Sequence, residues 1–121
     1  MIVVALAGGV GAATRFALDG LIGRSSLPWG TIIINLSGSL LLGFVLGLGA
    51  GFFAPEPWVQ VLGIGFFGGY TTFSTASFES VTLLRERRIG AALFTTLGIL
   101  ILATAMAGFG FWLGLLSAAY A

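Results

Sequence analysis

The residues most able to do chemistry lie in a run of glycines and hydroxyl side chains within an apolar stretch. Gly68 and Gly69 are followed by Tyr70 and then by the segment Thr71-Thr72-Phe73-Ser74-Thr75-Ala76-Ser77. Glycine and threonine are poor helix formers, and hydroxyls offer the backbone alternative hydrogen bonds, so we expect a break in the helix here. Within a membrane, irregular backbone is tolerated only where it is buried inside the protein or lines a cavity. Its freed carbonyls and amides can bind ions there. A continuous helix whose hydroxyls bond back one turn is the alternative.

A second polar cluster lies upstream. Thr31, Asn35 and Ser39 follow one another at intervals of four residues, which places them on one face of a helix. An amide deep in hydrocarbon needs a polar partner, so Asn35 should face the helix bundle or a wet path. A hydrogen bond between helices and a lining of an ion path are equally open interpretations of Asn35.

Amide N–H groups, hydroxyls and phenyl rings together suit a small, hard anion. The N–H and O–H donors replace its water, and the positive edge of a phenyl ring can face it. A proton-coupled exporter would need a carboxylate at depth, whereas Glu79 is predicted near the membrane surface. A cation path would use rings of carbonyls or carboxylates. The chain has no histidine or cysteine, so thiolate chemistry and the commonest metal ligands are excluded.

The elements that must position these residues follow from charge and hydropathy. Only five basic and four acidic residues occur among 121, and the mean hydropathy is +1.12. Soluble domains carry about a quarter charged residues, so the composition indicates a membrane protein. A cleaved signal peptide is a disfavoured interpretation of the first apolar stretch, because no basic segment precedes it. Since a membrane-crossing helix needs about 20 apolar residues, we predict one all-α domain, 1–121, with four spans at about 2–20, 31–53, 58–83 and 90–116.

Glycine spacing indicates how these helices pack. Gly43, Gly47 and Gly51 repeat every four residues in the second span, and Gly110 and Gly114 do so in the fourth. Small residues at this spacing let helix backbones approach closely in membranes. We interpret these glycines as packing residues.

The basic residues predict one orientation. Arg24 falls between the first two spans, and Arg85, Arg87 and Arg88 fall between the last two, whereas the middle connection holds only Glu56. Basic connections stay on the cytoplasmic side, so both termini are expected outside the cytoplasm. Four helices are too few to enclose an aqueous lumen, which implies an oligomer.

The motifs in the first three spans resemble the Fluc (CrcB) family of fluoride channels. The matching segments are Gly8-Gly9-Val10-Gly11-Ala12 with Arg15, Gly30-Thr31 with Asn35 and Gly38-Ser39, and Gly68 to Thr75 with Glu79. The resemblance implies a passive fluoride channel in the inner membrane of a prokaryote, which limits fluoride toxicity. It also implies a dual-topology dimer, in which two four-helix subunits lie antiparallel and form two pores between them, and a third helix broken near the membrane midplane.

The resemblance implies a role for each matching residue. Asn35 would be the pore-lining amide and Phe73 a ring whose edge faces fluoride. Thr72, Ser74 and Thr75 would supply hydroxyls, with Ser39 on the same path and Arg15 by the vestibule. A structural sodium ion would bind backbone carbonyls of the third helix, and Gly68 and Thr71 hold the corresponding positions. Further candidates for the path are Tyr70, Thr95 and Thr104.

Two departures from the family pattern bear on the partner. Many relatives carry a second phenylalanine where this chain has Ala76, so that ring must be lost or supplied by Tyr70, Phe78 or a partner. The charge bias is also stronger than in members that insert both ways. We therefore expect a homologous partner subunit of opposite orientation rather than a second copy of this chain.

Three alternatives to a fluoride channel stay open. They are a small four-span multidrug exporter, a non-conducting partner subunit and a pore for another anion.

Overall fold

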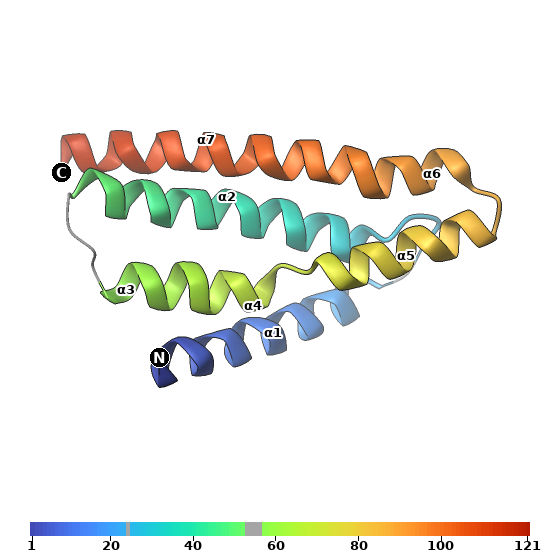
Figure 1. Cartoon of the computed structure of the whole chain (residues 1–121), viewed down its shortest axis with the longest axis horizontal. Helices are drawn as coiled ribbons and strands as arrows, with labels where there is room; N and C mark the ends of the chain where they lie inside the picture. The colour runs from blue at the N-terminus through green and yellow to red at the C-terminus, as the bar shows by residue number, and fades with distance from the viewer. Residues whose placement is uncertain (24, 53–56) are drawn as a thin grey trace.

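The computed structural model describes residues 1–23, 25–52 and 57–121, and every regular element within them is helical. The elements in chain order are α1 (Ile2–Ile22), α2 (Trp29–Gly51), α3 (Pro57–Val59), η1 (Gln60–Phe67), α4 (Gly68–Tyr70), α5 (Phe73–Arg85), α6 (Ile89–Leu93), η2 (Phe94–Gly98) and α7 (Ile99–Tyr120). The turns of η1 and η2 are wider, of π type. Helical backbone continues from α3 through α4, and again from α6 through α7 (Figure 1).

Three of these continuous helices are long and apolar enough to cross a membrane. They are α1, α2 and the 32-residue helix Ile89–Tyr120. The third predicted span corresponds instead to two shorter helical pieces, 57–70 and 73–85. The predictions that involve Arg24, Glu56 and residue 53 at the end of the second span lie outside the described residues.

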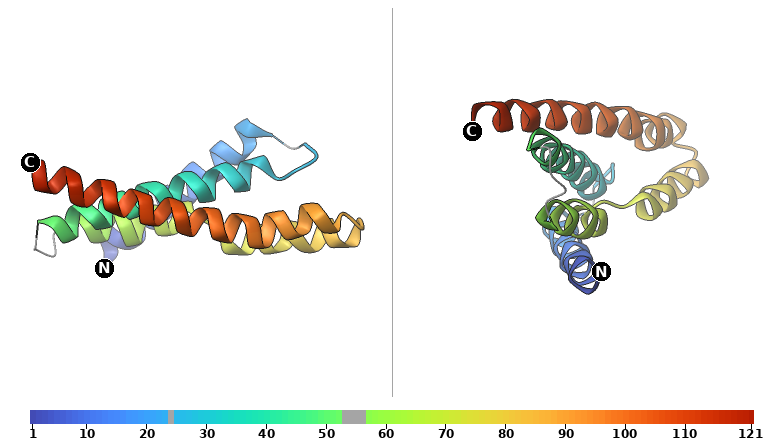
Figure 2. Two further views of the ribbon diagram at one scale, coloured as in Figure 1. Left: turned by 90° about the horizontal axis from the view of Figure 1, so that it is seen from above. Right: turned by 60° about the vertical axis from the view of Figure 1, so that its left-hand side comes forward.

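The helices form a bundle in which each helix has one principal neighbour. Helix α2 packs against α7, α1 packs against η1 and α4, and α5 packs against α6 and η2. Figure 2 shows α5 leaving the line of α3 and α4 and turning toward α6. Both termini lie at one end of the bundle, and the turn between α5 and α6 lies at the other (Figure 1).

Glycines bring α2 and α7 into direct backbone contact, which confirms their predicted packing role. A methyl group at Gly43 would collide with the carbonyl of Ala107, and one at Gly110 would collide with the carbonyl of Leu40. Gly47 and Gly114 likewise face the carbonyls of Phe111 and Phe44, whereas Gly51 faces the methyl group of Ala118. Close backbone approach therefore replaces side-chain interdigitation along this interface.

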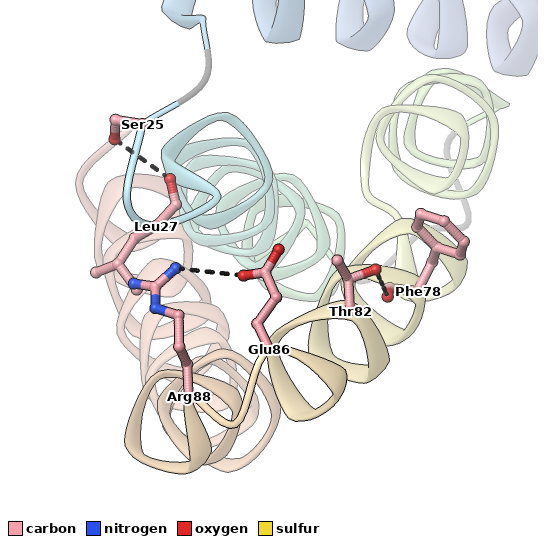
Figure 3. A network of polar contacts seen from close by, with 6 residues as sticks. All are labelled: Ser25, Leu27, Phe78, Thr82, Glu86 and Arg88. Atoms are coloured by element: carbon pink, nitrogen blue, oxygen red, sulfur yellow. Dashed lines mark hydrogen bonds and ion pairs between the residues drawn. The ribbon is translucent and has the colours of Figure 1, made fainter.

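The turn between α5 and α6 carries Arg87 and Arg88 at one end of the bundle, next to Arg85 at the end of α5. Arg87 takes the left-handed conformation (φ 57°), the Arg88 N–H donates to the Leu83 carbonyl at 2.9 Å, and the Arg87 N–H donates to the Leu84 carbonyl at 3.0 Å. These two bonds close the end of α5. Arg88 also reaches Glu86 at 3.9 Å (Figure 3), and an ion pair this exposed contributes little to stability.

Candidate functional site

The chain leaves the helical conformation between α4 and α5. Helix α4 ends at Tyr70, after which Thr71 (φ −74°, ψ 154°) and Thr72 (φ −144°, ψ 121°) are extended, and α5 begins at Phe73. The Thr72 hydroxyl accepts the Thr75 N–H at 3.2 Å and so caps the start of α5. The glycine- and hydroxyl-rich segment therefore contains the interruption and the cap that ends it.

The side chain of Asn35 pairs with the extended backbone of Thr72. Its Oδ1 accepts the Thr72 N–H at 2.8 Å, and its Nδ2 donates to the Thr72 carbonyl at 3.0 Å. Asn35 is 8% exposed, so both bonds are shielded. A primary amide has two N–H donors, so one stays available for another acceptor. Of the two interpretations of Asn35, the hydrogen bond to a neighbouring segment is therefore present, and its partner is the backbone of Thr72.

The interruption also frees two backbone carbonyls of their helical donors. In a continuous helix the Thr72 N–H would donate to the Gly68 carbonyl and the Thr75 N–H to the Thr71 carbonyl. The first N–H bonds Asn35 instead, and the second bonds the Thr72 hydroxyl. Gly68 is exposed on this chain. These are oxygen ligands of the kind that hard cations prefer.

Hydroxyls and one phenyl ring surround the start of α5. The Thr72 hydroxyl donates to the Thr75 hydroxyl at 3.1 Å and lies 3.4 Å from that of Ser74. The Thr71 hydroxyl donates back to the Phe67 carbonyl at 3.0 Å. The Phe73 side chain is 85% exposed and lies next to this polar cluster in the sequence.

A cavity of about 250 Å³ lies beside this segment, between α5, α2 and the helix that contains η2. Its lining consists of Asn35, Thr71, Thr72, Phe73, Ala76, Ser77, Ser80, Thr95, Thr96, Ile99, Leu100 and Ala103. We call it the first cavity.

The polar groups of the first cavity include one unsatisfied hydroxyl. Thr95 is 1% exposed, and its Oγ1 has no hydrogen-bond partner within the described part of the chain. Nearby, the Thr96 hydroxyl donates to that of Ser80 at 2.9 Å. A buried hydroxyl without a partner is costly, so Thr95 is suited to meet an occupant of the cavity.

The residues that α7 contributes to the first cavity are apolar. Ile99, Leu100 and Ala103 line it from α7, and Ala76 is a further apolar residue of the lining, from α5. The polar side chains of the first cavity therefore come from α2, the interruption, α5 and η2, and the lining residues of α7 offer no side-chain donor.

Several predicted site residues lie away from the first cavity. Tyr70 is buried and its hydroxyl lies 3.1 Å from that of Ser37, and Thr104 is exposed and donates to the Leu100 carbonyl. Ser39 is half-buried one turn beyond Asn35, and Arg15 is half-buried on α1 with its Nε lacking a partner among the described residues. None of these four residues lines a described cavity.

A second cavity, also of about 250 Å³, lies at the end of the bundle that carries the basic turn. Thr75, Phe78, Glu79 and Arg88 are among the residues that line it. Phe78 thus belongs to a different cavity from Phe73 and is not positioned as its companion ring within this chain.

Sequence reasoning missed Ser77 and Ser80 as cavity residues and did not single out Thr96. Phe73, Ser77 and Ser80 are spaced by four and three residues, which puts them on one face of α5. That spacing was a usable signal. The hydrogen bond between Thr96 and Ser80 depends on how α5 packs against η2, and nothing in the sequence signals it.

Comparisons with known proteins match nearly the whole chain. A sequence model of the family described as "CrcB-like protein, Camphor Resistance (CrcB)" matches residues 2–114. The chain is 50% identical to the fluoride-specific ion channel FluC 1 of Leifsonia xyli subsp. xyli, covering 98% of this chain and 89% of that protein. It is 44% identical to the fluoride-specific ion channel FluC 3 of Bifidobacterium longum, with 86% and 91% covered. It is 40% identical to the fluoride-specific ion channel FluC of Thermococcus kodakarensis, with 91% of each covered.

Proposed function

Because this chain belongs to the CrcB-like family, we propose that it is a subunit of a fluoride-specific ion channel through which fluoride leaves the cytoplasm passively. The observation that carries the proposal is the polar interruption between α4 and α5, with Asn35 bonded to it and Phe73 exposed beside it. No carboxylate lines the first cavity as described, which disfavours a proton-coupled drug exporter. The protein acts as a channel and not as an enzyme, and its role is to limit fluoride toxicity.

The path itself uses donors that replace the water around fluoride. The second N–H of Asn35 and the edge of the Phe73 ring face the ion, with hydroxyls of Thr72, Ser74 and Thr75 beside them. Thr95 adds an unpartnered hydroxyl within the first cavity. Fluoride is small and hard, so short O–H and N–H contacts favour it over larger anions.

A second channel subunit in the opposite orientation completes the pores. In lipid, the exposed Gly68, whose carbonyl lacks its helical donor, and the exposed Ser74 would leave polar groups beside an irregular backbone facing hydrocarbon, which is not tolerated unless protein covers them. We place this interruption, a broken third transmembrane helix, near the membrane midplane, at the interface of an antiparallel dimer with two pores.

The partner is a homologous subunit rather than a second copy. The turn between α5 and α6 holds Arg85, Arg87 and Arg88, whereas the two terminal segments hold no basic side chain. This bias favours one orientation, with the turn in the cytoplasm and both termini outside the inner membrane of a prokaryote. A strictly oriented chain needs a different, oppositely oriented chain as its partner.

A sodium ion at the dimer interface fits the donors present. The carbonyls of Gly68 and Thr71 have lost their helical donors, and neutral carbonyl oxygens of unwound helices suit Na⁺. A bound sodium ion supplies positive charge that offsets the dipoles of the converging carbonyls. These carbonyls would hold it together with those of the partner subunit.

One observation favours a second candidate, in which this chain is a non-conducting partner subunit. Ala76 stands beside Phe73, and Ile99 and Ala103 give the first cavity an apolar wall. An ion that passed along this wall would meet few hydrogen-bond donors. The functional pore would then be lined mainly by the other subunit.

The test is fluoride efflux from liposomes, measured with fluoride and chloride side by side. The chain is reconstituted alone and with a family member of opposite charge bias. Rapid, fluoride-selective efflux in either case is expected, and silence in both refutes the channel proposal. Asn35→Ser and Phe73→Ile should abolish the flux while leaving assembly intact. Ser117→Ala, which removes a hydroxyl that only donates back to Leu113 near the C-terminus, should leave it unchanged. If efflux with the partner persists in Asn35→Ser and Phe73→Ile, the second candidate gains support.

A further inference from the structure

The pairing of Asn35 with Thr72 has the geometry of a strand pair. In an antiparallel sheet, two residues exchange an N–H and a carbonyl bond across the ladder. Here the primary amide of Asn35 takes the part of the second strand, with bonds of 2.8 Å and 3.0 Å to the N–H and carbonyl of Thr72. The extended conformation of Thr72 therefore has a dedicated partner on α2.

That pairing decides the state of the Gly68 carbonyl. The Thr72 N–H is the donor that a continuous helix would give to Gly68. While Asn35 holds this N–H, the Gly68 carbonyl cannot receive it. In the same way, the Thr72 hydroxyl holds the Thr75 N–H at 3.2 Å and keeps it from the Thr71 carbonyl.

The two side chains free carbonyls at two successive points, one before the interruption and one at its first residue. Asn35 frees a carbonyl in α4, before the extended residues, and Thr72 frees one immediately after the end of α4. No helical donor within the described residues competes for either oxygen. A methyl group built on Gly68 would meet nothing nearer than the Gly63 carbonyl at 4.0 Å, so the chain itself leaves open space there.

We propose that Asn35 and Thr72 are positioning residues for the sodium ion, in addition to their places on the fluoride path. This inference rests on the proposed function. By holding two backbone N–H groups, the side chains keep the Gly68 and Thr71 carbonyls available to the cation. Because the Asn35 amide touches both the path and the interruption, cation binding and the aim of its remaining N–H are coupled.

Removing the amide should close the cation site. Without the Asn35 amide, the Thr72 N–H would lack a hydrogen-bond partner in a nonpolar environment. It would then donate to the Gly68 carbonyl, as in a continuous helix. Helix α4 would then run on toward α5. Asn35→Leu, which keeps a similar volume, should therefore weaken sodium binding even though its side chain does not contact the ion.

The measurement is thermal unfolding of the full-length protein, with its partner subunit where the two copurify, titrated with sodium against N-methyl-D-glucamine. The wild type should gain melting temperature with sodium. In Asn35→Leu the sodium concentration at half-maximal gain should rise about tenfold or more, as expected for the loss of about 1.4 kcal/mol of binding. Thr72→Val should do the same, whereas Thr72→Ser keeps the cap and the response.

Thr82→Ala is the matched control on α5. Its hydroxyl donates only to the Phe78 carbonyl one turn earlier, at 3.0 Å (Figure 3), so its loss frees no helical carbonyl at the interruption. The sodium response of this variant should equal that of the wild type. A weakened response in Thr82→Ala would mean that general destabilisation explains the other variants, and would overturn the inference.

Other outcomes separate this inference from the proposed function. A wild type without any sodium response overturns the inference, while efflux still decides whether the protein is a fluoride channel. If Asn35→Leu loses its flux but keeps the wild-type sodium concentration at half-maximal gain, Asn35 acts only on the anion path. That result also overturns the inference. If Asn35→Leu fails to fold, the comparison of Thr72→Val with Thr72→Ser tests the inference instead. Equal sodium concentrations at half-maximal gain in these two variants would overturn it.

Discussion

Replacing Thr95 by valine should make the protein more stable and a poorer channel. Thr95 is 1% exposed, and its hydroxyl has no hydrogen-bond partner among the described residues. Burying a hydroxyl without a partner costs about 1–3 kcal/mol. Valine puts a methyl group in the same place and removes that cost. We expect a gain of about 1 kcal/mol, the lower end, because a membrane protein that unfolds within the bilayer also finds partners for its polar groups.

The same substitution removes a hydroxyl from a residue that lines the first cavity. A hydrogen bond to a charged group contributes about 1.5–3 kcal/mol, which corresponds to roughly ten- to hundredfold in a rate or affinity. Fluoride efflux from liposomes containing Thr95→Val should therefore fall by at least about tenfold. Its melting temperature should rise by about 4 °C, the shift expected from about 1 kcal/mol in a chain of this size.

Thr31 offers the matched control. It is also 1% exposed with an unpartnered hydroxyl among the described residues, but it lines neither described cavity. Thr31→Val should give the same rise in melting temperature with unchanged efflux. A lower melting temperature in Thr95→Val would show that its hydroxyl is satisfied in the protein, and would refute the energetic reasoning. Unchanged efflux in Thr95→Val would remove Thr95 from the path.

Two further predictions concern packing and the helix before the interruption. Gly43→Ala, whose methyl group would collide with the α7 backbone, should lower the free energy of unfolding by about 1–3 kcal/mol, whereas Gly108→Ala, where nothing lies within 4 Å, should raise it by up to about 1 kcal/mol. Equal effects in chemical denaturation would contradict the close approach of the two helices. Tyr70→Phe removes the hydroxyl that lies 3.1 Å from that of Ser37 and should cost about 0.5–1.5 kcal/mol in the same assay, with efflux retained. A large loss of flux in Tyr70→Phe would return this residue to the ion path.

The sequence by itself identified a helical membrane protein and the glycine positions at which its helices pack closely. Nine charges in 121 residues leave long uncharged stretches, and lipid accepts only helices or closed barrels across them. The four-residue glycine repeats on α2 and α7 indicated close packing, and in the structure they lie where these two helices are in close contact. These inferences succeed because composition and local periodicity carry them, without any knowledge of which helices are neighbours.

The sequence also located the polar segment but left its state open. Poor helix formers and hydroxyls permitted either a break or a continuous helix with bonded hydroxyls, and local propensity could not choose between them. The choice depends on Asn35, 37 residues away, because its amide supplies the partners that the Thr72 backbone needs outside a helix. Such a pairing is a property of how α2 lies against the interruption.

Tertiary structure alone decided which candidates share a cavity. Thr95 and Thr104 looked alike as hydroxyls of one helix, yet Thr95 faces the first cavity and Thr104 is exposed. Ser80 joined the site only because α5 packs against η2 and brings it within 2.9 Å of Thr96. Residue type and spacing along the chain can name the groups able to bind an anion, but the rotation and contact of separate helices determine which of them meet.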